Sequence, residues 1–548
     1  MVENAPTIVE VLYARSSSQD SAYIFLADGT TASESRWTYA DTATRASAFA
    51  AWLSSRGLRR GSRVVLAVNP SLDYIAALFG IMTIGAVPVP CFPPLRAKEL
   101  DRFQSIVLDC DPHAIVIDAM YDTQVETLRR RLACVDIDPL IGYVDELDTH
   151  VDAVAPAACS PDDLALIQYT SGSTGSPKGV CITHDNLVSN CEVLSRSMGP
   201  DPNRVGLSWL PPYHDMGLMG TIILSLYHGW PLVLMSPMHF MQQPRRWLEA
   251  ITEYRVSITV GPNFSLDASI AALDDDVDDL DLSTVKEFYC GAEPISADTF
   301  ARFEECAAPL GFDVTALIPC YGMAEATLFV AGKRKGLRYN TVHGGDGIVV
   351  SCGEVDSEHV VRIVDPDSDC LVPLGEIGEI WVRGRSVAAG YFNQDRLTSK
   401  VFHARLDGEN GTYLRTGDLG FMRDDELFVT GRIKDLIIVN GRNIYPQDVE
   451  ANVMRADPSL RRAVAFSVAG EGTERLIVVA EAVFAEISTA FHTNLAEAVR
   501  SSVTSEFGVG PDVHICPRRT IPTTTSGKVR RQEAKRLFLA DATQWAPA

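Results

Sequence analysis

The stretch Tyr169-Thr-Ser-Gly-Ser-Thr-Gly-Ser-Pro-Lys-Gly179 carries the strongest signal in the chain. Its three glycines permit a tight loop with inward-pointing backbone amides, its hydroxyl side chains add hydrogen-bond donors, and Lys178 adds a positive charge. This composition suits the phosphates of a nucleotide, although the spacing is not that of a Walker A loop. A flexible linker would not follow the apolar run 164–168 directly. We therefore predict a phosphate-binding loop made of Thr170, Ser171, Gly172, Ser173, Thr174, Gly175 and Lys178.

Further motifs identify the loop's context. Four segments follow it in the chain: Gly291-Ala-Glu-Pro294, Tyr321-Gly-Met-Ala-Glu-Ala-Thr327, Tyr413-Leu-Arg-Thr-Gly-Asp-Leu419 and Thr523-Thr-Thr-Ser-Gly-Lys528. Together with the loop they resemble the signature segments of the adenylate-forming superfamily, which contains acyl-CoA synthetases, non-ribosomal adenylation domains and luciferases. The resemblance covers nearly the whole chain. It implies an α/β fold, with a large multi-subdomain N-terminal α/β domain (residues 1–433) and a small, mobile C-terminal α+β domain (residues 434–548).

The resemblance also implies roles for individual residues. Tyr321, with Gly322 and Met323, would stack on adenine, and the backbone of Gly291, Ala292 and Glu293 would flank it. Asp418 would accept hydrogen bonds from the ribose hydroxyls, and Arg432 would reach the ribose or a phosphate. Glu325 would hold Mg²⁺, which suits a carboxylate beside phosphate oxygens. Lys528 would neutralise charge during adenylation, and Lys434 would be the hinge. Taken alone, Glu325 reads as a helix-surface residue, Asp418 as a loop cap and Lys528 as an exposed lysine.

Three segments indicate the branch of the superfamily. They are Leu210-Pro-Pro-Tyr-His-Asp-Met-Gly-Leu-Met-Gly220, residues 321–330 and Gly441-Arg-Asn-Ile-Tyr-Pro-Gln-Asp-Val-Glu450. They resemble segments of fatty acyl-AMP ligases, which pass the acyl group to the phosphopantetheine arm of an acyl carrier protein. His214 would then lie at the mouth of the acyl pocket, and residues 265–269 are candidates for its wall. An amino-acid adenylation domain fits less well, because His214 stands between Tyr213 and Asp215. The segment 331–360 is shorter than the insertion typical of this branch, so coenzyme A remains an alternative acceptor.

Composition limits other functions. The chain has 548 residues and a net charge of −23, with a pI of about 4.9. This length exceeds what a single core supports, so at least two domains are expected. The acidic balance disfavours nucleic acid and anionic membrane surfaces as partners. Twelve scattered cysteines without a CxxC pair, no secretory signal in the first ten residues and no apolar run long enough to span a bilayer predict a cytoplasmic protein.

The pattern of elements agrees with an α/β fold. Residues 63–68 and 114–117 are predicted strands, and residues 74–84 a helix; their alternation favours largely parallel sheets. Residues 418–430 are predicted to form a hairpin just before the domain boundary. Two basic clusters could dock an acidic carrier protein, or could simply be solvated surface: Lys333-Arg-Lys335 with Arg338, and Arg530-Arg531 with Lys535-Arg536. The acidic run 274–279 is interpreted as a solvated loop.

The sequence thus predicts a ligase that uses ATP and Mg²⁺ to convert a fatty acid, or a related carboxylic acid, into acyl-AMP with release of pyrophosphate. The acyl group would then pass to a carrier protein, in the setting of fatty acid metabolism or of polyketide or lipopeptide biosynthesis. The alternatives are a fatty acyl-CoA ligase of the same fold, an amino-acid adenylation enzyme and a non-catalytic nucleotide-binding relative. No protein nucleophile is required, because positioning and charge stabilisation can drive both steps.

Overall fold

The computed structural model describes residues 5–95, 97–135, 137–146, 154–170, 177–273, 277, 279–344, 347–439, 442–469, 474–483, 489–524, 528–540 and 545. Near the N-terminus a four-stranded parallel sheet has the order β4-β3-β5-β6. Its strands are β3 (Arg63–Ala67), β4 (Val87–Pro90), β5 (Ala114–Ile117) and β6 (Leu140–Tyr143), connected through α3 (Leu72–Thr83), α4 (Ala97–Cys110) and α5 (Asp122–Leu132). The two predicted strands and the predicted helix are confirmed to within two residues at each end.

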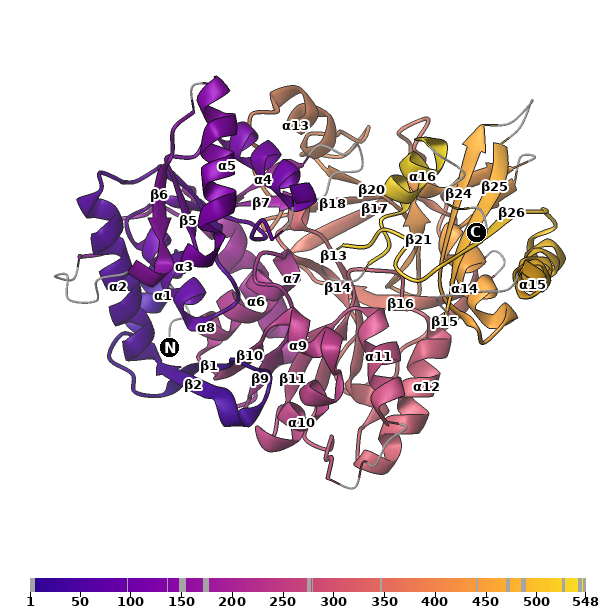
Figure 1. Ribbon diagram of the computed structural model, residues 1–548, viewed down its shortest axis with the longest axis horizontal. Coiled ribbons are helices and arrows are strands. Elements are labelled where there is room, and N and C mark those ends of the chain that lie inside the picture. The colour runs from indigo at the N-terminus through magenta and orange to yellow at the C-terminus, as the bar shows by residue number, and fades with distance from the viewer. Residues whose placement is uncertain are drawn as a thin grey trace.

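A large sheet of fourteen strands forms the centre of the molecule (Figure 1). In its first half, β1 (Ser21–Leu26), β10 (Leu232–Met235), β9 (Gly206–Ser208), β11 (Ile258–Gly261), β12 (Glu287–Cys290) and β13 (Leu317–Gly322) run parallel, with β2 (Glu34–Thr38) antiparallel at the edge. Helices packed with this half include α6 (His184–Met198), α10 (Arg245–Glu253), α11 (Asn263–Leu273) and α12 (Ala297–Ala307). Parallel strands covered in this way are apolar throughout, as the fully buried β10 and β11 are.

The second half of this sheet is antiparallel. Its strands are β14 (Phe329–Gly332), β16 (Gly347–Val355), β21 (Glu426–Arg432), β20 (Leu414–Arg423), β18 (Gly378–Gly384) and β17 (His359–Val364), and β15 (Thr341–Gly344) pairs with β16. The expectation of largely parallel sheets is therefore correct for only part of the molecule. Short connections such as the one between β20 and β21, which form the predicted hairpin, can join only antiparallel neighbours.

A third, small sheet holds the segment that flanks the predicted phosphate loop. Strand β7 (Leu164–Thr170) pairs antiparallel with β8 (Lys178–Thr183), and β8 pairs with β19 (Gly390–Tyr391). Helix α6 begins directly after β8, where the side chains of Thr183 and Asn186 form a capping box. The strands thus fix both ends of the loop.

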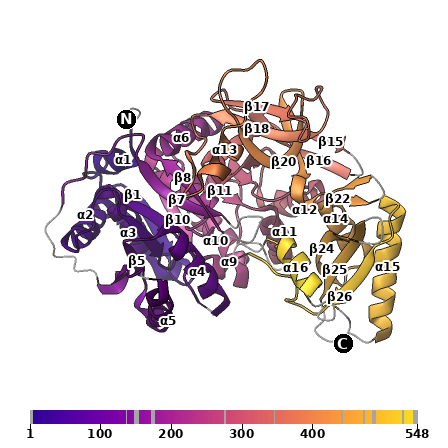
Figure 2. The ribbon, with the colours of Figure 1, turned by 90° about the horizontal axis from the view of Figure 1, so that it is seen from above.

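The C-terminal residues build a separate, smaller unit, drawn in orange and yellow at one side of the molecule (Figures 1 and 2). Its three-stranded sheet consists of β24 (Leu460–Ala469), β25 (Glu474–Ala482) and β26 (Asp512–Cys516). Helices α14 (Pro446–Ala456) and α15 (Thr489–Phe507) pack on one apolar cluster of this unit, and α16 (Arg531–Ala540) packs on another. The hairpin of β22 (Ile437–Val439) and β23 (Arg442–Ile444) precedes it. The fold is α/β with a large N-terminal and a small C-terminal domain, as predicted; residue 433 as the boundary stays a prediction.

The remaining helices lie in the large domain. They are α1 (Ile8–Ala14), α2 (Tyr39–Ser55), α7 (Asp215–Gly217), α8 (Leu224–His228), α9 (Pro237–Gln242) and α13 (Asp395–Phe402), with a π-helical turn at Leu218–Ile223 between α7 and α8. Among the described residues, no helix combines the length and the apolar character needed to cross a membrane.

Candidate active site

A cavity of about 3020 Å³ is lined by residues of both domains. On the large domain, the strands β7, β12 and β13 end at its wall, which is where open α/β sheets bind ligands. The small domain contributes the segment around residue 528. Most of the predicted site residues line this cavity: Thr170, Lys178, His214, Ala292, Glu293, Tyr321, Gly322, Met323, Glu325, Asp418, Arg432, Lys434 and Lys528.

One corner of the cavity brings together three predicted nucleoside-binding residues. The hydroxyl of Tyr321, near the end of β13, donates a hydrogen bond to Oδ2 of Asp418 at 2.8 Å. The other carboxylate oxygen lies 3.0 Å from Nε of Arg432. Asp418 and Arg432 are register partners on β20 and β21, so the hairpin itself sets this ion pair. Burial, reinforced by Asp418, holds the pKa of Tyr321 well above its usual value, so the phenol stays protonated and donates.

The loop after β12 adopts a backbone conformation that side chains disfavour. Ala292 has a φ of 67°, in the left-handed region where a non-glycine residue costs about 1–3 kcal/mol. The preceding Gly291 lies so close to Cys320 that a Cβ on it would come within 2.8 Å of the Cys320 carbonyl oxygen. Glu293 accepts a hydrogen bond from the backbone N–H of Phe264 at 2.7 Å. The strained loop therefore places the Glu293 side chain, as well as the backbone, at the cavity.

Glu325 is placed by a short 3₁₀ turn, Ala324–Ala326, that follows β13. The hydroxyl of Tyr391 donates to Oε1 of Glu325 at 2.8 Å, and the ammonium of Lys178 lies 5.0 Å from the centre of the Tyr391 ring. Burial raises the pKa of Glu325 above its usual value, so a nearby cation would stabilise its charged form. Within the described ranges no group of three or more His, Cys, Asp or Glu side chains could hold a metal ion. A carboxylate is a ligand type that Mg²⁺ prefers, so the chemistry of Glu325 suits the magnesium role, which stays a prediction.

Lys528 reaches into the large domain's side of the cavity. Burial lowers its pKa, while the charges of Glu293 and Asp215 favour its protonated form and Arg432 opposes it. Its backbone is held by hydrogen bonds with Thr524, whose N–H donates to the Lys528 carbonyl at 2.7 Å. The neighbouring residues 525–527 lie outside the described part of the chain. Lys528 of the small domain thus lines the same cavity as Asp215 and Glu293 of the large one.

His214 lies beside Asp215 at the start of α7. Its Nδ1 is 2.6 Å from Oδ1 of Asp215. Although burial alone raises the pKa of Asp215, His214 and then Lys528 outweigh it and lower that pKa to about 2. The Asp215 carboxylate therefore stays ionised. His214 is in direct contact with this carboxylate, whose pKa Lys528 also lowers.

The phosphate loop is described only at its ends. Thr170 and Lys178 are register partners across β7 and β8, and both line the cavity. Ser171, Gly172, Ser173, Thr174 and Gly175 lie outside the described residues, as do Asp274–Asp276 and Asp278 of the acidic run. The role predicted for the loop stays a prediction.

The residues on either side of Lys434 form side-chain contacts with different domains. Arg432 is paired with Asp418 of the large domain, whereas Asp435 accepts from Gln532 at 2.7 Å and lies 3.2 Å from Arg531, both on α16. Lys434 lies between these anchors in the 3₁₀ turn Ile433–Asp435. Burial lowers the pKa of Lys434, and Arg432 adds to this effect.

Several predicted surface and pocket residues have other roles. Lys333 is buried and donates to the carbonyl oxygens of Thr315, Arg334 and Leu337, and burial lowers its pKa to about 8. The rest of the first basic cluster is also paired, namely Arg334 with Glu354, Lys335 with Glu287 and Arg338 with Glu304. Burial removes Lys333 from the surface, whereas Arg334 and Arg338 stay exposed in their ion pairs, so docking at these two residues stays a prediction.

The second basic cluster and the serines of α11 are likewise engaged. Arg531 pairs with Glu450 at 2.8 Å and Arg536 with Glu533 at 2.9 Å. The hydroxyls of Ser265 and Ser269 donate to the carbonyl oxygens of Pro262 and Ser265, so both are bonded to the backbone of their own segment. Within the predicted segment 265–269, Asp267 lines the cavity and the two serines do not; the preceding Phe264 also lines it.

Two site residues escape prediction from the sequence. Tyr391 is distant in sequence from Glu325 and lies outside the motifs, so no local pattern reveals their hydrogen bond. Asp215 is adjacent to His214, but the sequence gives no indication that Lys528 of the other domain faces it. The feature that could have identified Asp215 is its position in the 210–220 segment, next to the predicted His214.

The chain was compared with known proteins. A family profile described as AMP-binding enzyme matches residues 13–392. Medium-chain-fatty-acid–[acyl-carrier-protein] ligase JamA of Moorena producens is 36% identical, with 97% of this chain and 95% of that protein covered. Putative fatty-acid–CoA ligase FadD21 of Mycobacterium tuberculosis is 35% identical, with 86% of each covered. The crystal structure of the L. pneumophila fatty acyl-adenylate ligase in complex with acyl adenylate and pyrophosphate superposes with a TM-score of 0.76, at 32% identity over 98% of this chain and 97% of that one.

Proposed function

The chain belongs to the family of AMP-binding enzymes, and we propose that within it the chain activates a fatty acid with ATP and then transfers the acyl group to a thiol. In the first step a carboxylate oxygen of the acid attacks the α-phosphorus of ATP, and the bond to the bridging oxygen breaks so that pyrophosphate leaves. In the second, the thiol sulfur attacks the acyl carbon and AMP leaves. Relatives named as fatty-acid ligases support a fatty acid as the substrate.

The observation that carries this proposal is that Lys528 of the small domain lines the same cavity as Asp215, Glu293 and the Tyr321–Asp418–Arg432 corner of the large domain. The first step brings two anions together, so a cation held at the reacting centre stabilises the transition state. Burial lowers the pKa of Lys528, and the charges of Glu293 and Asp215 oppose this by favouring its protonated form. In this arrangement the lysine supplies charge without acting as a nucleophile.

The corner residues would hold the nucleoside. Asp418 would accept hydrogen bonds from the ribose hydroxyls and Tyr321 would lie against the base, while Arg432 would hold the Asp418 carboxylate in position. Glu325, oriented by the hydroxyl of Tyr391, would hold Mg²⁺, which when bound neutralises phosphate charge. Thr170 and Lys178 would fix the phosphate loop.

For the acceptor we propose the phosphopantetheine thiol of an acyl carrier protein, because a 36% identical relative is named for transfer to one. Coenzyme A is the alternative acceptor, because the segment 331–360, which contains the β15–β16 hairpin, is shorter than the insertion typical of fatty acyl-AMP ligases. The use of ATP and the reduced state of all twelve cysteines support work in the cytoplasm.

Mass spectrometry of the full-length protein with ATP, Mg²⁺ and decanoate tests the proposal. Accumulation of decanoyl-AMP, with thioester formed on a holo carrier protein but little on coenzyme A, is the expected result. Rapid formation of decanoyl-CoA would show that coenzyme A, and not a carrier protein, is the acceptor. Absence of acyl-AMP with every acid tried would refute the activity itself.

A further inference from the structure

The cavity has an apolar arm that leaves the reacting centre and follows one face of the parallel sheet. Residues of β9 to β12, of α6 and of α8 line it: Leu194, Gly206, Leu224, Leu232, Val260 and Tyr289. Val260 and Tyr289 are register partners on β11 and β12, so they point to the same face of the sheet. An arm with this lining suits the alkyl part of the acid.

Trp230 stands at the far end of the arm. Gly206 is in register with Leu232 on one side and with Ile258 on the other, and Ile258 is in register with Glu287. A Cβ on Gly206 would lie 3.3 Å from Nε1 of Trp230 and 3.0 Å from Leu232, so the indole approaches the sheet at this level. The arm therefore ends where Trp230 meets Gly206.

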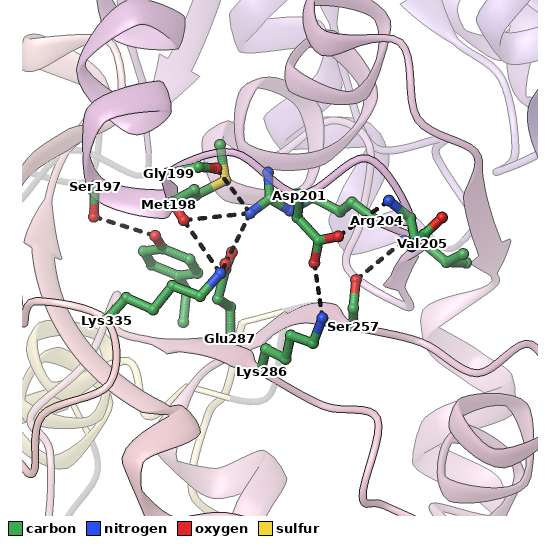
Figure 3. A network of polar contacts seen from close by, with 12 residues as sticks. Ser197, Met198, Gly199, Asp201, Arg204, Val205, Ser257, Lys286, Glu287 and Lys335 are labelled. Carbon is green, nitrogen blue, oxygen red and sulfur yellow. Dashed lines mark hydrogen bonds and ion pairs between the residues drawn. The ribbon is translucent and has the colours of Figure 1, made fainter.

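The end wall is held rigidly from behind. The Trp230 ring stacks on His228 with centroids 4.7 Å apart and planes at 8°, and the guanidinium of Arg204 lies 4.9 Å from its centre. Arg204 in turn lies 2.8 Å from Glu287, which also pairs with Lys335 (Figure 3). Because an alkyl chain that passed Trp230 would have to break this buried ion network, the wall cannot yield cheaply.

The sheet gives the length of the arm. From the level of Glu287 to Gly291, directly before the cavity-lining Ala292, the chain advances four residues, which at about 3.3 Å per residue is about 13 Å. Carbon–carbon bonds of about 1.5 Å advance an extended alkyl chain by about 1.3 Å each, so about ten carbons fill this span.

From this geometry we propose that the enzyme selects unbranched medium-chain acids of about ten carbons and that Trp230, packed over Gly206, sets the limit. The inference rests on the proposed activation of a fatty acid and specifies its substrate. Each methylene buried in the arm raises kcat/KM about fourfold until the wall is reached. Longer chains do not fit between the reacting centre and the wall, so their kcat/KM falls.

Pyrophosphate release measured with saturated acids from butyrate to stearate tests this. In the natural protein kcat/KM is expected to rise to about decanoate and to fall at least tenfold by palmitate. Trp230→Ala is expected to shift the optimum towards myristate, and Gly206→Val to shift it towards hexanoate. The ratio of rates with two acids is taken within each variant, so differences in folded protein cancel.

The outcomes separate the two proposals. Equal use of decanoate and stearate by the natural protein, or an unchanged optimum in both variants, overturns the role of Trp230 and leaves the proposed activity standing. No acyl-AMP with any acid in the natural protein overturns both. Opposite shifts in the two variants support the wall at Gly206.

Discussion

Replacing Glu287 by glutamine tests the buried ion network behind the arm. The Glu287 side chain is 1% exposed and that of Arg204 is 4% exposed, so neither can be rehydrated without unfolding; Lys335, at 31%, can turn outward (Figure 3). At 2.8 Å the gross attraction between Glu287 and Arg204 is about 6 kcal/mol for an effective dielectric constant of about 20. Removing one partner of such a pair typically costs about 3–5 kcal/mol, because the other charge stays buried. The amide oxygen of glutamine can still accept one hydrogen bond, so about 3 kcal/mol is expected.

Calorimetric unfolding measures this loss. The two domains need not unfold together, so the transition of the large domain is followed. With about 2 cal/mol/K per residue, the unfolding entropy of a domain of about 430 residues is about 0.9 kcal/mol/K. Dividing the expected loss of about 3 kcal/mol by this entropy, we expect Glu287→Gln to lower the Tm of the large domain by about 3 °C. The matched control is Glu126→Gln, which removes the exposed pair with Arg129 and should change Tm by less than 1 °C.

A Tm for Glu287→Gln as close to the natural value as that of the control would refute the reasoning. A second check uses Arg204→Met together with Glu287→Gln. Since the penalty arises from an uncompensated charge, the double variant should be less destabilised than the two single changes combined. Strict additivity would mean that the attraction across 2.8 Å contributes nothing.

Three other outcomes follow from the structure. Lys528→Ala should slow acyl-AMP formation about 10²–10³-fold while transfer from preformed acyl-AMP continues, because only the first step joins two anions; equal loss of both half-reactions, followed by pyrophosphate and thioester release, would contradict this. Asp418→Asn should weaken ATP binding, measured by calorimetry, by about 10–100-fold, the loss expected for hydrogen bonds to a charged group. Burial lowers the pKa of His184 to about 4, so below pH 6.5 the unfolded chain takes up a proton that the native state refuses. The contribution of His184 to the free energy of unfolding is thus full above pH 6.5 and falls by about 2 kcal/mol by pH 5. His184→Gln should remove this part of the pH dependence of the unfolding free energy, which urea titrations at several pH values measure.

The sequence was most informative where function depends on neighbours in the chain. Tyr321, Asp418, Arg432 and Lys528 were predicted as one site, and the structure brings them to one cavity, because each is held by the strand or loop that its own motif encodes. The Tyr391–Glu325 bond was not predictable in this way. It depends on β19 pairing with β8, a contact between segments with no shared motif.

Charge runs were a poor guide. Lys333, Arg334 and Lys335 look like an exposed basic patch, but the bend after β14 turns Lys333 into the interior and gives the other two acidic partners. A sequence shows the sign of a charge and not whether a fold brings an opposite charge to it. The end wall of the arm was not predictable either, because Trp230 and Gly206 are distant in sequence and only the pairing of the strands brings them together.

The anchors on either side of Lys434 restrict how the small domain can move. Arg432 is bound to the large domain through Asp418, and Asp435 is bound to α16 through Arg531 and Gln532. Helix α16 begins only three residues after Lys528, so the lysine, the helix and Asp435 belong to one body. Any rotation that leaves these bonds intact must therefore occur at Ile433 and Lys434. On the proposed function, such a rotation would withdraw Lys528 from Asp215 and Glu293 after the first step and free their side of the cavity for the thiol.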